Sequence, residues 1–180
     1  MQIVHGDALR FDPAPYLPGP FKLVGNLPYQ IASRLILRFV AFERMRLAVA
    51  MVQDEVARRL AARPGGKEYG VSSVLVQARA EVETVARLGR TVFYPPPRVD
   101  SAVVRIRPKG GVELPPAFDA VVKAAFAQRR KTLRRNLQSL GRACGLDADR
   151  WLEEAGIDPD LRAEDVSPDG FLQLARLTGR

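Results

Sequence analysis

The sequence predicts an α/β domain followed by a small all-helical domain. Up to about residue 108, short apolar stretches with strand character alternate with segments of helical periodicity, which is the pattern of a sheet with helices packed on it. Residues 109–116 are rich in proline and glycine, a composition typical of a linker. Beyond them the periodicity is helical. We therefore expect a sheet domain over residues 1–108 and a helical domain over residues 117–180.

The elements of the first domain follow from its apolar stretches and their boundaries. Strands are expected at residues 2–5, 22–25, 46–52, 84–89 and 102–107. The last two should form an antiparallel pair around the turn Pro95–Pro97. Helices are expected at residues 31–42 and from the end of the third strand to about Ala62, whereas residues 71–80 fit either state. Because strands alternate with helices, we expect both faces of the sheet to be covered.

The last part of the second domain is expected to contain two short helices. One covers residues 148–155, with Asp147 as N-cap and Gly156 ending it. The other covers residues 169–177, with Ser167 as N-cap followed by a proline at the first helical position. The expected core of this domain consists of Trp151, Leu152, Leu161, Phe171, Leu174 and Leu177.

The strongest functional signal is the tetrapeptide Asn26-Leu27-Pro28-Tyr29, which follows an apolar strand. The exocyclic amine of adenine is a poor nucleophile because its lone pair is delocalised into the ring. Hydrogen bonds from this amine to the Asn26 side-chain oxygen and the Leu27 carbonyl would favour a pyramidal nitrogen with its lone pair aimed at a methyl donor. Pro28 stiffens the turn, and Tyr29 offers a ring face to an extruded base. The motif therefore predicts methylation of an exocyclic amine of a nucleic-acid base.

Other stretches point to one family. They are Gly6–Leu9, Met51–Val56, Phe93–Val104 and Phe126–Leu133. With the tetrapeptide, and in this order, they resemble the ribosomal RNA adenine N6,N6-dimethyltransferases, relatives of the antibiotic-resistance rRNA methylases, over nearly the whole chain. The resemblance implies a Rossmann-type methyltransferase sheet, a helix at residues 71–80, and dimethylation of adenine N6 in small-subunit (16S) rRNA during ribosome biogenesis. It also implies S-adenosylmethionine as methyl donor, the 30S ribosomal subunit as partner, and a monomer for the complete protein.

One part of the family's pattern is absent from this sequence. Members resemble other Rossmann-type methyltransferases in a Gly-rich loop after the first strand, which cradles the methionine part of S-adenosylmethionine, and an acidic residue after the second, which holds its ribose. The paired glycines here, Gly65–Gly66 and Gly110–Gly111, lie in loop contexts, and Met1–Asp7 corresponds to the family's third strand. The resemblance therefore implies the C-terminal two-thirds of such an enzyme, with half of the cofactor site absent and one sheet edge exposed.

The resemblance also assigns roles to individual residues. Asp7 matches the carboxylate that receives the adenine amine of the cofactor, and Ala8 adds a backbone contact, although a carboxylate that ends a strand also commonly caps a turn. Asn26 orients the target amine close to the cofactor. Phe93 matches the aromatic residue that closes the other face of the target base, whereas Tyr94 is expected to pack in the core. No role follows from the sequence for Arg98, Asp100 and Ser101, which also match the family.

The positive charge is concentrated in one segment. The chain has a formal net charge of +8, and its only stretch of seven basic residues without an acidic one lies between Asp119 and Asp147. Apolar side chains three or four residues apart predict one amphipathic helix here, from Phe118 to Leu140. Basic side chains four residues apart on a helix repel each other unless phosphates neutralise them. We therefore predict RNA contact, with a solvated helix face as the alternative, through Lys123, Arg129, Arg130, Lys131, Arg134 and Arg135.

Composition argues against several other classes of protein. No apolar run approaches the roughly 18 residues that a membrane span needs, and the N-terminus lacks the pattern of a secretory signal. The single Cys144 excludes an internal disulfide and suits a reducing compartment, and one histidine with one cysteine leaves no plausible zinc site. We therefore expect a cytoplasmic protein with no bound metal.

Two other functions stay open. A non-catalytic RNA-binding or ribosome-assembly module would keep the basic segment and the base-binding loop without a cofactor, and the missing Gly-rich loop favours it. A DNA adenine methyltransferase would share the Asn-x-Pro-Tyr chemistry. A methylase of large-subunit rRNA is a variant of the rRNA dimethyltransferase hypothesis, but Phe93–Pro97 and Phe126–Leu133 look more like the small-subunit branch of the family.

Overall fold

The computed structural model describes residues 3–179, which form two compact units. The sheet unit comprises residues 3–58 and 79–110, and the helical unit comprises residues 59–78 and 111–179. The chain therefore passes between the units near residues 58, 78 and 110, whereas the sequence suggests one passage, at residues 109–116.

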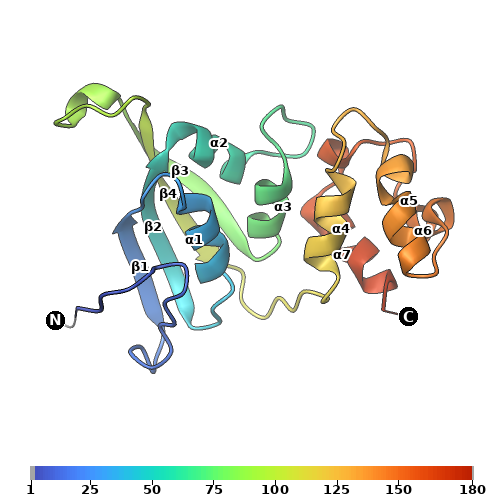
Figure 1. Cartoon of the computed structure of the whole chain (residues 1–180), viewed down its shortest axis with the longest axis horizontal. Coiled ribbons are helices and arrows are strands. Elements are labelled where there is room, and N and C mark those ends of the chain that lie inside the picture. The colour runs from blue at the N-terminus through green and yellow to red at the C-terminus, as the bar shows by residue number, and fades with distance from the viewer. Residues whose placement is uncertain (1–2, 180) are drawn as a thin grey trace. The chain divides into compact units, whose positions relative to one another are not determined.

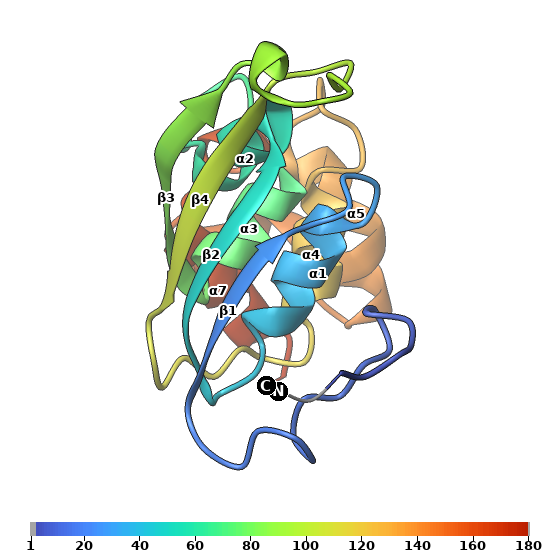
Figure 2. The same ribbon diagram turned by 90° about the vertical axis from the view of Figure 1, so that its left-hand side faces the viewer.

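The sheet unit is built on a mixed four-stranded sheet with the order β1-β2-β4-β3. β1 (Phe21–Asn26) pairs in parallel with β2 (Met45–Gln53), and β4 (Ser101–Pro108) pairs antiparallel with both β2 and β3 (Ala80–Leu88). Figure 2 shows β1 and β3 at opposite edges of this sheet. The predicted α/β class and the antiparallel pair around the proline-rich turn are confirmed.

Burial of the sheet alternates along the central strands. Every second residue is buried, because successive side chains of a strand point to opposite faces; these residues are Ala48, Ala50 and Val52 of β2, and Ala102, Val104 and Ile106 of β4. α1 (Ala32–Phe39) buries Ala32, Leu35, Ile36 and Phe39, which share one side of a helix. Figure 1 shows α1 lying against one face of the sheet.

The expectation of helices on both faces of the sheet is wrong for the sheet unit. Figure 2 looks onto a face on which no helix of this unit lies, and Val24 of β1 is 79% exposed. The reason is topological. The single β1-α1-β2 crossover places its helix on one side of the sheet. After β2 the chain adds no further complete α-helix to the sheet unit, because α2 continues into the helical unit and α3 belongs to it.

The strand expected at residues 2–5 is also wrong over residues 3–5, which form no strand; residue 2 lies outside the described residues. Ile3 is 81% exposed. A strand is stable only where its backbone groups pair with a neighbour. The described sheet ends at β1, which pairs only with β2, so residues 3–5 have no neighbouring strand.

The helical unit contains most of the remaining helices. They are α3 (Val71–Gln77), α4 (Phe118–Ala125), α5 (Leu133–Ala143), α6 (Ala148–Glu154) and α7 (Pro168–Leu177), while α2 (Asp54–Ala61) begins in the sheet unit and ends in the helical unit. The helix that the resemblance implies at residues 71–80 is confirmed over α3, whereas Ala80 already begins β3.

The predicted caps of the last two helices are confirmed. The Asp147 carboxylate accepts the N–H groups of the second and third residues of α6, each at 3.1 Å, and Gly156 follows that helix with φ +70°. The Ser167 hydroxyl accepts the Gly170 N–H at 3.2 Å at the start of α7. These side chains satisfy amide groups that have no partner within the helix.

The core of the helical unit agrees with the sequence except at two positions. Trp151, Leu152, Phe171 and Leu174 are at most 1% exposed, and the Trp151 indole N–H donates to the Leu174 carbonyl at 2.9 Å. Leu161 is 37% exposed, so its place in the predicted core is wrong, and Leu177 is only partly buried. Leu161 contributes its backbone instead, because its carbonyl accepts the Leu133 N–H at 2.8 Å.

The basic segment is not one helix. α4 ends at Ala125 and α5 begins at Leu133, with turns between them. The Asn136 side-chain amide donates to the Ala125 carbonyl at 2.6 Å and to the Gln128 carbonyl at 3.1 Å. Because this side chain bonds carbonyls that a continuous helix would use internally, the break is stabilised. The basic side chains four residues apart, Arg130 with Arg134 and Lys131 with Arg135, are therefore not neighbours on one helix, because Arg130 and Lys131 precede α5.

A buried tyrosine should make the stability of the helical unit sensitive to alkaline pH. The Tyr69 hydroxyl donates to the Val166 carbonyl at 2.9 Å, and the side chain is 2% exposed. Burial raises the pKa of Tyr69 well above its ordinary value of 10.0, and the negative charge of Asp169 raises it further. The neutral hydroxyl stabilises the fold below about pH 10; above it the unfolded chain ionises first, so this stability is lost as pH rises.

We expect Tyr69→Phe to lower the free energy of unfolding by about 1 kcal/mol at pH 7, since a hydrogen bond to a buried carbonyl is lost. Urea unfolding followed above pH 10 should then show a shallower loss of stability than in the unsubstituted protein. Tyr94→Phe is the matched control, because that side chain is fully exposed at 100%. Equal alkaline slopes for the Tyr69→Phe variant and the unsubstituted protein would contradict the assignment.

Candidate functional site

The tetrapeptide Asn26–Tyr29 lies where β1 leaves the sheet. Asn26 is the last residue of β1, paired with Met51 of β2, and it is exposed. The Leu27 N–H donates to the Met51 carbonyl at 3.1 Å, and Leu27 is buried. The base of the turn is therefore fixed to the sheet while Asn26 faces solvent. The carboxyl ends of parallel strands are the usual ligand-binding edge of open α/β sheets.

Tyr29 is anchored at its polar end. The side chain is half-buried, and its hydroxyl lies 2.7 Å from the Ser101 hydroxyl. Ser101 is the first residue of β4 and is fully buried. The sequence gives no role to Ser101; the signal that could have found it is its position within the family-like stretch Phe93–Val104, next to Asp100.

The predicted second aromatic residue lies in the loop between β3 and β4. Phe93 follows the short 3-10 helix η1 (Arg90–Val92) and is partly exposed. Tyr94 is 100% exposed, so the expectation that it packs in the core is wrong. Figure 1 shows why: this loop projects beyond the ends of β3 and β4, where the sheet unit offers no core to enter.

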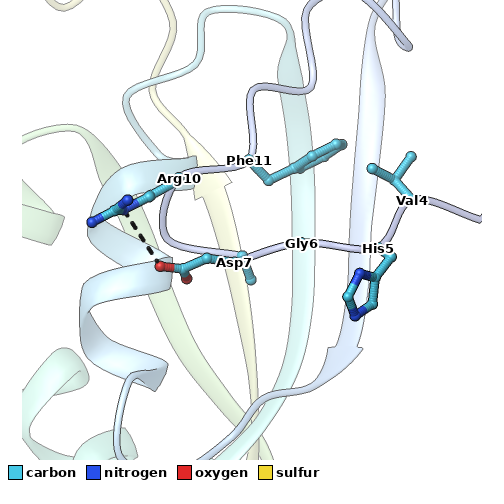
Figure 3. Close-up of a pocket in the computed structure, with 7 residues that line it drawn as sticks. Val4, His5, Gly6, Asp7, Arg10 and Phe11 are labelled. Atoms are coloured by element: carbon cyan, nitrogen blue, oxygen red, sulfur yellow. Dashed lines mark ion pairs between the residues drawn. The ribbon is translucent and has the colours of Figure 1, made fainter.

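The predicted cofactor residues Asp7 and Ala8 lie in one pocket of about 420 Å³. It is lined by Val4, His5, Gly6, Asp7, Ala8, Arg10 and Phe11, shown in Figure 3. The segment is tied to α1 because the Arg38 guanidinium donates to the Phe11 carbonyl at 2.8 Å. Neither Asn26 nor Phe93 lines this pocket.

The Asp7 carboxylate already caps a turn. Its Oδ1 accepts the Leu9 N–H at 2.9 Å, and its Oδ2 lies 3.7 Å from Nε of Arg10, the pair that Figure 3 marks. The Asp7 side chain is nevertheless 52% exposed. A carboxylate oxygen accepts more than one hydrogen bond, so this group can cap the turn and receive a further donor.

The predicted RNA-binding residues fall into two groups. Arg129 pairs with Glu164 at 2.9 Å and also donates to the Lys67 carbonyl, and Arg134 pairs with both Asp149 and Asp160. These two guanidinium groups therefore brace the helical unit. The remaining four are exposed as well but form no ion pair among the described residues: Lys123, Arg130, Lys131 and Arg135. Because no carboxylate neutralises their charge, the second group are the better candidates for contact with phosphates.

A comparison with protein families decides which family the chain is part of. The sequence model described as "Ribosomal RNA adenine dimethylase" matches residues 1–178. The chain belongs to the ribosomal RNA adenine dimethylase family. The family that the sequence resembles is thus confirmed, and its members are rRNA methyltransferases.

Curated relatives in this family are proteins named "Ribosomal RNA small subunit methyltransferase A". The one from Syntrophotalea carbinolica is 45% identical over 184 residues, which cover 97% of this chain and 69% of that protein. The one from Rhodospirillum rubrum is 43% identical over 183 residues, which cover 98% of this chain and 61% of that protein. The chain thus spans roughly two-thirds of the length of these relatives, from 61% to 69%.

Solved structures support the fold. A dimethyladenosine transferase from Plasmodium falciparum superposes with a TM-score of 0.79 at 24% identity, covering 98% of this chain and 72% of that one. The 23S rRNA methyltransferase ErmE gives a TM-score of 0.66 at 26% identity, covering 98% of this chain and 71% of that one. Among the described residues, no helix is long and apolar enough to cross a membrane.

Proposed function

We propose that this chain acts in the S-adenosylmethionine-dependent dimethylation of adenine N6 in small-subunit rRNA, during ribosome biogenesis. The observation that carries the proposal is the exposed Asn26 at the carboxyl end of β1, followed by Leu27, Pro28 and Tyr29, in a member of the rRNA adenine dimethylase family. The names of the small-subunit methyltransferase relatives support the choice of RNA.

In this proposal the chain positions the target base. The Asn26 side-chain oxygen and the Leu27 carbonyl accept hydrogen bonds from the adenine amine and turn its lone pair outward. Tyr29 stacks on one face of the base and Phe93 closes the other. S-adenosylmethionine, when bound, supplies an activated methyl group that the nitrogen attacks in line. The residues need only position and polarise, so no covalent enzyme intermediate is required.

The residues of the pocket around Asp7 fit one end of the cofactor. Its volume of about 420 Å³ lies within the usual range of roughly 300–1,000 Å³ for ligand sites. The half-exposed Asp7 carboxylate provides the acceptor that an adenine amine requires. We propose that Asp7 and Ala8 hold the adenine end. No Gly-rich loop follows a strand in this sequence to hold the methionine end, so the chain supplies half of the family's cofactor site.

The proposal is tested by titrating the chain with S-adenosylmethionine in a calorimeter and by incubating it with small ribosomal subunits and radiolabelled cofactor. Saturable binding, with label recovered as N6,N6-dimethyladenine, would support the proposal and show that the half of the cofactor site in this chain suffices for transfer. A folded chain that binds RNA but neither binds the cofactor nor transfers label would favour the non-catalytic RNA-binding module. Duplex DNA that competes better than rRNA as methyl acceptor would favour a DNA adenine methyltransferase.

The two groups of basic residues should differ in their effect on RNA binding. We expect Arg130→Ala to reduce the slope of log affinity against log salt by about 0.7–0.9, the value for one lost phosphate contact. Arg129→Ala is the matched control, because its charge is already paired with Glu164. Fluorescence anisotropy with a hairpin RNA between 50 and 200 mM salt measures the slopes. A larger change for Arg129→Ala than for Arg130→Ala would contradict this division.

A further inference from the structure

Two adjacent residues, Asp100 at the end of the β3–β4 loop and Ser101 at the start of β4, hold the two segments that carry the predicted base-binding aromatics. Ser101 and Asp100 end the loop that contains Phe93, and Ser101 also reaches the turn after β1. The sequence offers no role for either residue. Their contacts indicate one.

Ser101 is a rigid point of attachment. As the first residue of β4 it pairs with Gln53 of β2 on one side and with Leu88 of β3 on the other. Its exposed fraction is 0%, and with Ser73 it makes up the buried polar residues of the described chain. A buried hydroxyl needs a hydrogen-bond partner, since leaving it unpaired is costly. The partner here is the Tyr29 hydroxyl, at 2.7 Å and 72 residues away in the sequence.

This bond restricts the Tyr29 ring. A tyrosine in a turn otherwise samples several side-chain rotamers. When the ring must present one face to a base, that freedom is lost on binding, and the affinity for the base is lower. Tyr29 is only half-buried, so packing alone leaves part of the ring without contacts. Fixing its hydroxyl to a strand that is bonded on both edges pre-organises the ring before a base arrives.

Asp100 fixes the second segment. Its carboxylate accepts the Arg90 N–H at 2.9 Å, and its carbonyl accepts the Asp54 N–H at 3.0 Å. The first bond closes the loop from Gly89 to Asp100, which contains Phe93, and the second ties the end of this loop to the start of α2. The positions of Tyr29 and Phe93 thus both depend on the dipeptide Asp100–Ser101.

We propose that Ser101 is a positioning residue for recognition of the target adenine, acting through the Tyr29 hydroxyl. The proposal rests on the proposed function, because it requires Tyr29 to stack on an extruded base. Ser101 itself does not touch the base. It determines how much of the intrinsic stacking affinity is realised in binding.

The test compares two RNA probes: a hairpin with adenines in its loop, and the same hairpin with abasic sites at those positions. The affinity ratio isolates base recognition from phosphate contacts. For the unsubstituted chain we expect a ratio of about tenfold or more, the usual contribution of aromatic stacking. Tyr29→Phe and Ser101→Ala should each reduce this ratio about fivefold, the effect of one neutral hydrogen bond. The double variant should lose no more than either single variant, because both remove the same bond.

Ser73→Ala is the matched control. Ser73 is also 0% exposed, and its hydroxyl donates to the Arg59 carbonyl, but it lies on α3 in the helical unit. This variant should lose stability without changing the affinity ratio. Ser101→Thr keeps the hydroxyl and should restore the ratio. Tyr29→Phe removes a single partly exposed oxygen, so it folds even if Ser101→Ala does not.

The outcomes separate the two proposals. If the unsubstituted chain does not prefer the adenine hairpin, the base-recognition function fails and the role of Ser101 fails with it. If the preference is present but Tyr29→Phe and Ser101→Ala leave it unchanged, the role of Ser101 alone is overturned. A parallel loss of affinity for both probes would also overturn it, because that result indicates a purely structural effect.

Discussion

Asn26→Ala is expected to lower the rate of methyl transfer to small ribosomal subunits by about 10²–10³-fold, the usual loss when one pre-organised hydrogen-bonding group of an active site is removed. The side-chain oxygen that orients the adenine amine is lost, so the lone pair stays delocalised. Because Asn26 is exposed at the end of β1, the substitution leaves no cavity, and the fold should be retained. RNA affinity and its salt dependence should stay unchanged, since phosphates are bound elsewhere.

Single-turnover transfer of labelled methyl groups, measured beside anisotropy titrations with a hairpin RNA, separates the two effects. Gln30→Ala is the matched control, because Gln30 is also exposed and follows the tetrapeptide directly. It should transfer methyl groups at nearly the unsubstituted rate. An equal loss of methyl transfer and of RNA affinity in Asn26→Ala would show that Asn26 acts in RNA binding and not in the chemical step.

Trp151→Ala is expected to lower the free energy of unfolding of the helical unit by about 3–5 kcal/mol, the range for a large buried aromatic side chain. Trp151 is 1% exposed in α6. The Trp151 ring lies so near Gly141 of α5 that a Cβ at that glycine would be 3.7 Å from it. The Trp151 indole N–H donates to the Leu174 carbonyl of α7. One side chain therefore joins three helices, and its removal leaves a cavity between them.

Urea unfolding followed by far-ultraviolet circular dichroism measures this loss without relying on tryptophan fluorescence. Trp151→Phe is the matched variant. It keeps an aromatic ring but leaves the Leu174 carbonyl without its donor, so we expect a smaller loss of about 1–3 kcal/mol. A loss below about 1 kcal/mol in Trp151→Ala would show that the three helices do not depend on this contact.

The sequence predicts most of the fold because its local signals agree with the tertiary structure. The apolar runs that became β1, β2 and β4, and the caps Asp147 and Ser167, are decided within a few residues of each element. The break between α4 and α5 is different. No glycine or proline marks it; it depends on Asn136 and on the Leu161 carbonyl, groups brought there by the fold. Thr132, a residue type common at N-caps, was the one local signal.

The candidate site shows the same division. The tetrapeptide stands out in the sequence because its chemistry is unusual for a strand end, whereas Asp7 is singled out only by the resemblance to the family. The partner of Tyr29 does not, because Ser101 lies 72 residues away and only strand pairing brings it near. Likewise, charge alone cannot separate Arg129 and Arg134 from their neighbours. Their carboxylate partners Glu164, Asp149 and Asp160 come from later segments of the chain.

The three passages of the chain between the units limit how this protein can be dissected. The helical unit draws α3 from residues 59–78, and α3 contacts α4 and α7, which come from residues 111–179. A single cut at residues 109–116 therefore leaves α3 on the fragment that carries the sheet. The other fragment would expose the surfaces of α4 and α7 that α3 covers. A cleavage in this linker therefore does not yield an intact helical unit, and a cut near residue 58, which keeps that unit on one fragment, also keeps β3 and β4 with it.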